Sequence, residues 1–209
     1  MTLRLNGSTS GYTEIDAPAV AGSNTLVLPT GNGSADQALV TNGSGTLSFA
    51  DRGRLVQGTA QNSTSGTSID FTSIPSWVKR VTVMLSGVSA NGSSNLIIQI
   101  GTSGGVETSG YLGAAGYTSA GSAAGNFTTG FGLSFGTGAV SVFHGVALIT
   151  SMGSNLWAFG WSGAFSNSAN SLSGGGSKTL SGTLDRLRIT TVNGTDTFDA
   201  GSINILYEG

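Results

Sequence analysis

Apolar and polar residues alternate along residues 79–86, so that Val81, Val83 and Leu85 fall on one face of an extended chain. The opposite face is polar except at Met84. A period of two residues is that of a half-buried β-strand. Similar segments recur between Gly, Ser and Asn turns, and none keeps the 3.6-residue period of an amphipathic helix. The sequence therefore predicts an all-β protein.

Nine strand-like segments are expected after residue 55. They are 56–60, 69–86, 96–100, 106–112, 127–135, 140–150, 156–165, 184–192 and 203–207. Short strands separated at regular intervals by turn signals predict an antiparallel β-sandwich, jelly-roll-like, over residues 55–209. The pair Asn193-Gly194 is expected to join the last two strands into a hairpin.

Two of these segments, 127–135 and 156–165, carry large residues on one face and Gly, Ala, Ser or Thr on the other. The large face is expected in the core. The small face lets another backbone approach closely, and that neighbour could be a second subunit. The other reading, that glycine only adapts the curvature of the strand, stays open.

Residues 1–54 differ from the rest, because apolar pieces of two or three residues alternate with turn pairs such as Asn6-Gly7 and Asn42-Gly43. Such pieces bury too little surface in a monomer to offset the entropy of ordering, roughly 1–2 kcal/mol per residue. Several copies wound around one axis would bury more. We therefore expect an extended N-terminal anchor or shaft segment, with a flexible leader as the alternative. The charge cluster Asp51-Arg-Gly-Arg54 marks the expected boundary.

Charge is sparse, at 9% of residues against a typical value of about 25%. Because 38% of the residues are hydrophobic, we still expect folding rather than disorder. A surface of Ser, Thr, Asn and Gly suits a protein that packs into a larger assembly. The net charge of −2 predicts no nucleic-acid partner. The lack of cysteine excludes a disulfide framework and thiolate chemistry.

Residues 1–7 lack the basic and apolar regions of a signal peptide, and the sequence has no apolar stretch of 18 residues. No membrane insertion is expected.

His144 is the single histidine, and it alternates with Val142, Val146 and Leu148. This pattern places it on an apolar strand face, as a core or interface residue. Without a second histidine or any cysteine, no zinc or other metal site is expected, and no cofactor.

The carboxylates do not form a recognisable catalytic pattern. Asp196 and Asp199 flank a predicted turn, where aspartates usually cap backbone amides. The segment Gly174-Gly-Gly-Ser-Lys178 superficially resembles a phosphate loop but lacks its spacing and a following helix. We therefore predict no catalytic residue and no enzyme activity. Arg186 and Arg188 are expected on the outward face of a strand, as edge protection or a subunit contact.

Two tyrosines are the candidate receptor-binding residues. Tyr111 and Tyr117 lie in a Gly/Ala/Ser-rich segment, 110–126, that is expected to be an exposed loop. Loops on a rigid sandwich often carry recognition, and tyrosine rings can stack on sugars. The alternative is that each tyrosine only anchors the loop.

Residues 13–49 resemble a segment of tailed-phage fibre and other virion proteins. The resemblance rests on Ala-Pro followed by Asn-Thr-Leu-x-Leu-Pro, and then on Gln-x-Leu-x-Thr-Asn-Gly-Ser-Gly-Thr-Leu-Ser-Phe. The second half is similar to distal domains of phage fibres. Its strings are Ile74-Pro-Ser-Trp-Val-Lys-Arg-Val-Thr-Val-Met-Leu-Ser-Gly-Val88, Gly101-Thr-Ser-Gly-Gly-Val-Glu-Thr-Ser-Gly-Tyr111 and Leu184-Asp-Arg-Leu-Arg-Ile-Thr190.

The resemblance implies a homotrimer with a slender N-terminal segment and a C-terminal β knob. It implies a virion protein that is assembled in the host cytoplasm and exposed outside the cell. The N-terminal segment would dock on other virion proteins, and the knob would bind a host cell-surface glycan. Many fibres are much longer and carry a dedicated baseplate-binding head, which leaves two further hypotheses. One is a capsid decoration (cement or head-fibre) protein, and the other, less favoured, is a surface-glycan depolymerase.

Overall fold

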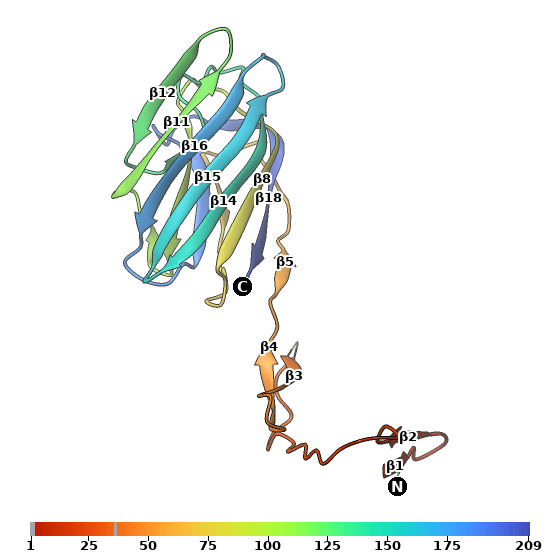
Figure 1. Cartoon of the computed structure of the whole chain (residues 1–209). Coiled ribbons are helices and arrows are strands. Elements are labelled where there is room, and N and C mark those ends of the chain that lie inside the picture. Colours follow the sequence, from red (N-terminus) through yellow and green to blue (C-terminus); the bar gives the residue numbers. More distant parts are fainter. Residues whose placement is uncertain (1–2, 36) are drawn as a thin grey trace. The chain divides into compact units, whose positions relative to one another are not determined.

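Residues 3–35 and 37–209 are described by the computed structural model, and all the regular structure across them is β-strand (Figure 1). The predicted all-β class is confirmed. The chain divides into two compact units, Met1–Arg52 and Gly53–Gly209, called here the N-terminal unit and the β domain. This division lies two residues before the predicted boundary. Within the described residues, no helix is long and apolar enough to cross a membrane.

The N-terminal unit contains two small antiparallel hairpins. β1 (Leu3–Asn6) pairs with β2 (Tyr12–Ile15), and β3 (Gln37–Thr41) pairs with β4 (Leu47–Asp51). Asn42 forms the second turn, since its side-chain oxygen accepts hydrogen bonds from the amides of Ser44 and Thr46 at 2.8 and 3.2 Å. Of residues 3–35, 37–50 and 52, none is buried. The unit therefore has no core of its own within those residues.

The β domain contains two sheets. The smaller sheet is antiparallel and has the strand order β10-β9-β17-β7, with β13 also paired to β9. Its strands are β7 (Ser68–Phe71), β9 (Leu96–Thr102), β10 (Gly105–Val106), β13 (Phe131–Gly132) and β17 (Arg186–Thr191). The apolar run of β9 is buried on both faces up to Gly101. Such a run indicates a central strand covered from both sides.

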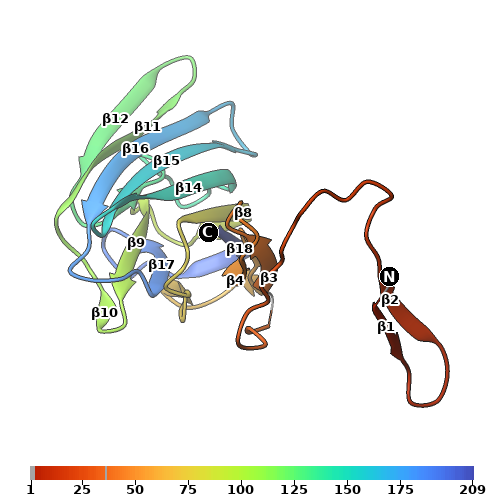
Figure 2. The ribbon, with the colours of Figure 1, turned by 60° about the horizontal axis from the view of Figure 1, so that its bottom comes forward.

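The larger antiparallel sheet is ordered β12-β11-β16-β15-β14-β8-β18-β5, with β6 also paired to β18 (Figure 2). Its strands are β5 (Leu55–Gln57), β6 (Gln61–Asn62), β8 (Arg80–Ala90), β11 (Tyr111–Thr118), β12 (Ser122–Phe127), β14 (Phe143–Gly153), β15 (Leu156–Phe165), β16 (Ser171–Thr179) and β18 (Phe198–Glu208). We call the end of the domain with β5 and the C-terminus of β18 the proximal end, and the opposite end the distal end.

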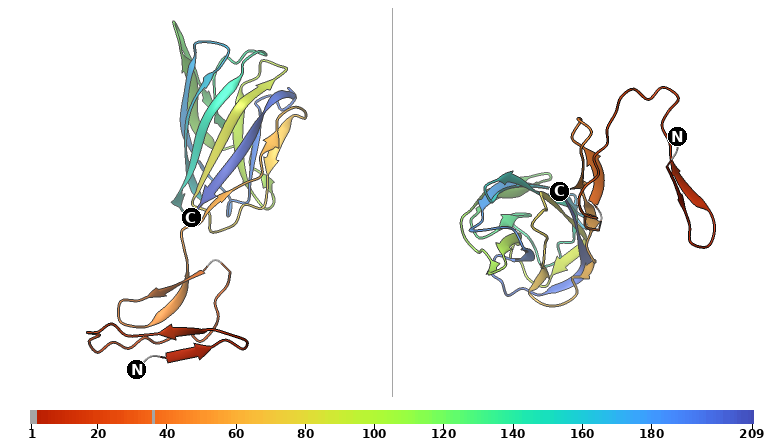
Figure 3. Two further views of the ribbon diagram at one scale, coloured as in Figure 1. Left: turned by 90° about the vertical axis from the view of Figure 1, so that its right-hand side faces the viewer. Right: turned by 90° about the horizontal axis from the view of Figure 1, so that it is seen from below.

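The main core lies between the two sheets, which curve around it (Figure 3). Alternating residues of β8 face inward, as the sequence predicts, and Val81 and Val83 are fully buried. At its centre Phe131 stacks on Phe159 with ring centroids 4.6 Å apart, and it meets the edge of Tyr111 at 4.9 Å. The aromatic cluster therefore ties β11, β13 and β15 together across the domain.

Several sequence-based boundaries are wrong. Residues 69–86 form two strands in different sheets, β7 and β8, and the predicted strand 127–135 is mostly irregular, with β13 limited to two residues. The turn at Asn193-Gly194 exists, since the Gly194 amide donates to the Thr191 carbonyl at 3.0 Å. It does not form a hairpin, because β17 and β18 belong to different sheets.

β16 was not predicted, although it is a central strand between β11 and β15. Its sequence has one aliphatic residue, Leu172, and the run Gly174 to Gly176. The strand exists because both neighbours pair with it along almost its whole length. Glycine gives no apolar pattern, so the signal that marked other strands was missing here.

The Trp161 ring packs over Gly163 on β15. A Cβ at Gly163 would overlap this ring and lie 2.6 Å from the His144 carbonyl oxygen, whereas a Cβ at Gly121 would meet nothing within 4 Å. We expect Gly163→Ala to lower the free energy of unfolding by about 1–3 kcal/mol through overpacking. The control Gly121→Ala should change it by less than about 1 kcal/mol. Urea unfolding measures both, and equal effects would contradict this packing.

Candidate functional site

The segment 110–126 is a β-hairpin made of β11 and β12, so the prediction of an exposed loop is wrong. The turn is closed by the Ser119 amide, which donates to the Gly121 carbonyl at 2.7 Å. The strands approach closely at Gly116, where a Cβ would collide with the Ala123 carbonyl and the Ala124 side chain. Glycine at this position therefore permits the tight hairpin.

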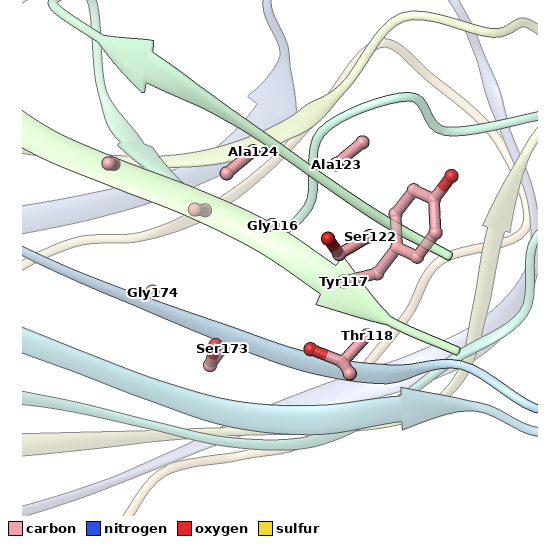
Figure 4. A pocket seen from close by; sticks show the side chains of 10 residues that line it. Gly116, Tyr117, Thr118, Ser122, Ala123, Ala124, Ser173 and Gly174 are labelled. Atoms are coloured by element: carbon pink, nitrogen blue, oxygen red, sulfur yellow. The ribbon is translucent and has the colours of Figure 1, made fainter. Parts of the chain in front are cut away.

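An open groove of about 500 Å³ lies along this hairpin (Figure 4). It is lined by β11, β12 and β16, through Ala114, Ala115, Gly116, Tyr117, Thr118, Ser122, Ala123, Ala124, Ser173 and Gly174. Of these described lining residues none is charged, and the polar side-chain groups are four hydroxyls, on Tyr117, Thr118, Ser122 and Ser173. Such a lining can accept a surface of small or aliphatic groups, with a few hydrogen bonds.

The Tyr117 ring points away from the hydroxyl groups of Thr118 and Ser122. Thr118 and Ser122 project to one side of the hairpin, and Tyr117 and Ala123 project to the other (Figure 4). The ring is half-buried and packs at the edge of the core. Tyr117 thus keeps part of its ring accessible at the distal end of the domain, and its role in receptor binding remains a prediction.

Tyr111 is placed differently. It begins β11, its side chain is only 1% exposed, and its ring belongs to the aromatic cluster. Its hydroxyl accepts a hydrogen bond from the Ile100 amide at 2.8 Å and donates to the Glu107 carbonyl at 2.9 Å. Burial raises the pKa of Tyr111. As positioned, the side chain is a core residue and presents no ring to a receptor.

A buried ion pair lies beside Tyr111 at the proximal end. Lys178 Nζ is 2.5 Å from Glu107 Oε2, and the Lys178 side chain is 8% exposed against 22% for Glu107. The other Glu107 oxygen accepts the amide and hydroxyl of Ser181 at 2.8 and 2.7 Å. Burial alone would raise the pKa of Glu107, but the bonds from Lys178 and Ser181 outweigh it and hold the pKa below its ordinary value. The pair fastens the 103–110 connection to β16.

Arg186 and Arg188 do not protect a sheet edge, because β17 lies between β9 and β7. Arg188 forms a two-pronged pair with Asp70 on the neighbouring strand, with both bonds at 2.7 Å. The hydrogen bonds that Arg188 donates to Asp70 raise the pKa of Arg188. Arg186 bonds to Asp185 at 2.9 Å and to the Ser103 carbonyl at 2.9 Å. Both arginines are used within the domain.

The carboxylates at the distal end are held by local hydrogen bonds. Asp196 accepts the Ser94 amide at 2.9 Å and the Asn193 side chain at 2.6 Å, and Asp199 accepts the Ser89 hydroxyl. Asp196 thus accepts a backbone amide, although from a residue far away in the sequence, whereas Asp199 accepts a side-chain hydroxyl and, among the described residues, caps no local amide. Among the residues described, no group of three His, Cys, Asp or Glu side chains could hold a metal ion.

His144 lies on the exposed side of β14, so it is not a core residue. Its neighbours on this side, Val146 and Leu148, are each 43% exposed. The alternating sequence correctly placed His144, Val146 and Leu148 on one face of the strand. It did not show whether that face points toward the core or away from it, because alternation is the same in both cases.

A scan against protein-family models found no match, and searches of curated proteins and of solved structures found no similar chain.

Proposed function

We propose that this protein is a phage virion subunit, a homotrimeric tail-fibre-like protein that attaches to the host cell surface. The N-terminal unit docks on other virion proteins, and the β domain carries the host-binding surface. The protein is assembled in the host cytoplasm and exposed outside the cell in the virion. The proposal combines the sequence resemblance with one structural observation, the N-terminal unit without buried residues.

The N-terminal unit exposes apolar side chains that a solitary chain does not cover. Its exposed large hydrophobic residues are Leu3, Leu5, Tyr12, Ile15, Val20, Leu26, Val27, Leu28 and Leu39. These exposed apolar side chains support assembly with copies of the same chain.

Strand order supports a jelly-roll description of the β domain. The chain alternates between the sheets from β7 through β8 and β9 to β11, and the late strand β17 then inserts between β7 and β9. A late strand that returns beside early strands is the mark of a Greek key, and a jelly roll contains two of them. We propose a jelly-roll sandwich whose larger sheet is widened by the β15–β16 hairpin and β18.

Host binding is assigned to the distal end, where the accessible part of Tyr117 lies. The proposed ligand class is a cell-surface glycan, because an accessible aromatic face suits sugar recognition. Weak sites repeated in three copies would gain from avidity. Binding of the protein and of its Tyr117→Ala variant to immobilised host glycans measures this contact, and equal binding would remove Tyr117 from the site.

Two measurements on the intact protein test the proposed assembly and its location. Light scattering at micromolar concentration is expected to give three times the chain mass of 20.8 kDa. A monomeric mass would remove the main support for a fibre. Antibody labelling of virions should then mark the tail. Label on the head would instead favour a capsid decoration protein. If incubation with this protein lowered the viscosity of a host-glycan solution, and Asp196→Asn abolished that effect, the depolymerase hypothesis would be favoured.

A further inference from the structure

A hollow of about 170 Å³, called here the proximal pocket, lies at the proximal end of the β domain. The segments that enter β8 and β17 and the turn between β14 and β15 surround it. Its lining residues are Ser76, Val78, Lys79, Ser151, Gly153, Ser154, Asn155, Trp157, Thr183 and Leu184. An apolar cavity of about 150 Å³ is known to hold one benzene ring. The proximal pocket is therefore large enough for a single six-membered ring.

Lys79 stands on the core-facing side of this end. It precedes β8, in which Val81 and Val83 face the core, so alternation places residue 79 on the same face. Its backbone carbonyl accepts the Ser151 amide at 2.8 Å, and Ser151 is the pairing partner of Trp157. The three residues form a row at the proximal edge of the larger sheet. Where that row would continue the core with an apolar side chain, it presents an ammonium group to the pocket.

The positive charge of Lys79 has no carboxylate beside it. None of the described lining residues is acidic, and Lys79 forms no ion pair within the part of the chain that the structure describes. The carboxylates at this end are paired with other cations, in the pairs Arg80–Glu208, Arg186–Asp185 and Lys178–Glu107. The proximal pocket therefore attracts an anionic group.

Hydroxyl groups surround the charge. Those of Ser76, Ser154 and Thr183 form no hydrogen bond with any other described residue. The Ser151 hydroxyl accepts the Gly153 amide at 3.3 Å, which leaves its own proton free. All four hydroxyls can donate a hydrogen bond to a ligand oxygen, and they can also accept one. This mixture of donors and acceptors matches a ligand that is itself rich in hydroxyl groups.

The turn that lines the pocket has a defined conformation. Ser154 and Asn155 have φ angles of 49° and 59°, which are uncommon for residues other than glycine. Two consecutive residues of this kind form the hairpin turn that matches the twist of the flanking strands. The Asn155 carbonyl also accepts the Leu180 amide at 3.0 Å. The polar side chains of the turn are therefore preorganised beside Lys79.

A second hollow, of about 480 Å³, adjoins the proximal pocket, because Ser76, Thr183 and Leu184 line both. Its other lining residues are Ile74, Thr102, Ser103, Ser181, Gly182 and Asp185. Hydroxyl groups thus continue beyond the proximal pocket. A ligand longer than one ring has room to extend into this second hollow.

We propose that the proximal pocket binds one acidic sugar unit, with its carboxylate at Lys79 and its hydroxyl groups on the surrounding serine and threonine side chains. This site is separate from the accessible ring of Tyr117 at the distal end. The inference does not depend on the proposed role in a virion. A neutral sugar leaves the ammonium group without a counter-charge, so it binds more weakly than an acidic sugar of the same size.

Ligand-observed NMR titration of the full chain tests the site with D-glucuronate, D-galacturonate, D-glucose and inorganic phosphate. For at least one of the two acidic sugars we expect a dissociation constant on the order of 1 mM. D-glucose should bind at least about fivefold more weakly, because it makes no charged contact. Absence of binding by both acidic sugars would overturn the inference. Binding of phosphate but of neither acidic sugar would also overturn it, and would assign Lys79 to a free anion.

Three variants locate the binding on the protein. Lys79→Met should weaken binding of the acidic sugar by at least about fivefold. Thr183→Trp should abolish it, since Thr183 is exposed and a large ring there fills the pocket while the charge of Lys79 stays. The matched control Arg80→Met removes the same charge one residue further along, on the opposite face of β8, and should change the affinity less than about twofold.

Urea unfolding shows that each variant is folded before it is titrated. An acidic sugar that binds Lys79→Met as well as the natural protein would overturn the inference. Equal losses of affinity for Lys79→Met and Arg80→Met would do the same, because they would reduce the contact to the overall charge of the protein.

Discussion

Replacing Phe131 by alanine is expected to lower the free energy of unfolding by about 3–5 kcal/mol. The ring is 1% exposed, it stacks on Phe159, and its edge contact with Tyr111 connects β13 to β11. β13 has only two residues. The ring fills a fully buried site between β11 and β15, so its removal leaves a cavity in the core. Urea unfolding of the full chain, followed by tryptophan fluorescence, measures the loss.

Phe135→Ala is the matched control. Phe135 lies four residues further along, is 40% exposed, and its ring lies over Gly125 of the hairpin. Its removal should cost less than about 1.5 kcal/mol. Losses of similar size for Phe131 and Phe135 would contradict the central position of the aromatic cluster.

The second large effect concerns the pair of Glu107 and Lys178. Glu107→Ala is expected to lower the free energy of unfolding by about 3 kcal/mol, because the Lys178 side chain, only 8% exposed, loses its counter-charge. Lys178→Met should cost only about 1 kcal/mol, since Glu107 keeps its two bonds from Ser181 and methionine fills the same space. Unfolding at pH 7 compares the two variants. A larger loss of stability for Lys178→Met would show that leaving the Glu107 carboxylate unpaired costs more than leaving the Lys178 ammonium group unpaired.

The same pair predicts a pH dependence with a defined sign. The folded pKa of Glu107 is depressed, so its contribution is fully present above the unfolded pKa, about 4.3, and is lost as the pH falls through the folded pKa. The stability difference between the natural protein and Glu107→Gln should therefore be largest near neutral pH and shrink below about pH 4. A difference that stays constant down to pH 3 would exclude this linkage.

The strands that the sequence predicted well are those with an internal apolar pattern. The residues of β8 alternate, and Leu96 to Ile100 of β9 are apolar except for Gln99, so both strands can be recognised from the sequence. β16 has neither pattern, because its neighbours β11 and β15 impose its conformation through backbone pairing that no local propensity encodes. The sequence also did not show to which sheet a strand belongs. The turn at Asn193-Gly194 can be recognised from its residues, but the placement of β17 and β18 in different sheets depends on long-range packing.

The candidate site was predicted in part. The sequence drew attention to Tyr111 and Tyr117. It could not show that Tyr111 is buried in the core while Tyr117, six residues later on the same strand, is partly accessible. In an alternating strand both side chains point to the same face, and only the depth of the core beneath each decides its exposure. The alternation around His144 identified an apolar face correctly. Its outward direction became visible only when pairing joined segments far apart in the chain.

The position of β18 has a consequence for how the protein is made. This last strand pairs with β8 on one edge and with β5 and β6 on the other, and the Gly209 amide donates to the Arg54 carbonyl at 3.2 Å. The first and last strands of the β domain are therefore direct partners across more than 140 residues of sequence. During synthesis the apolar residues of β8 lack this partner until residues 198–208 have been made, and contacts of such separation form slowly. The β domain is therefore completed by the strand that is made last within it.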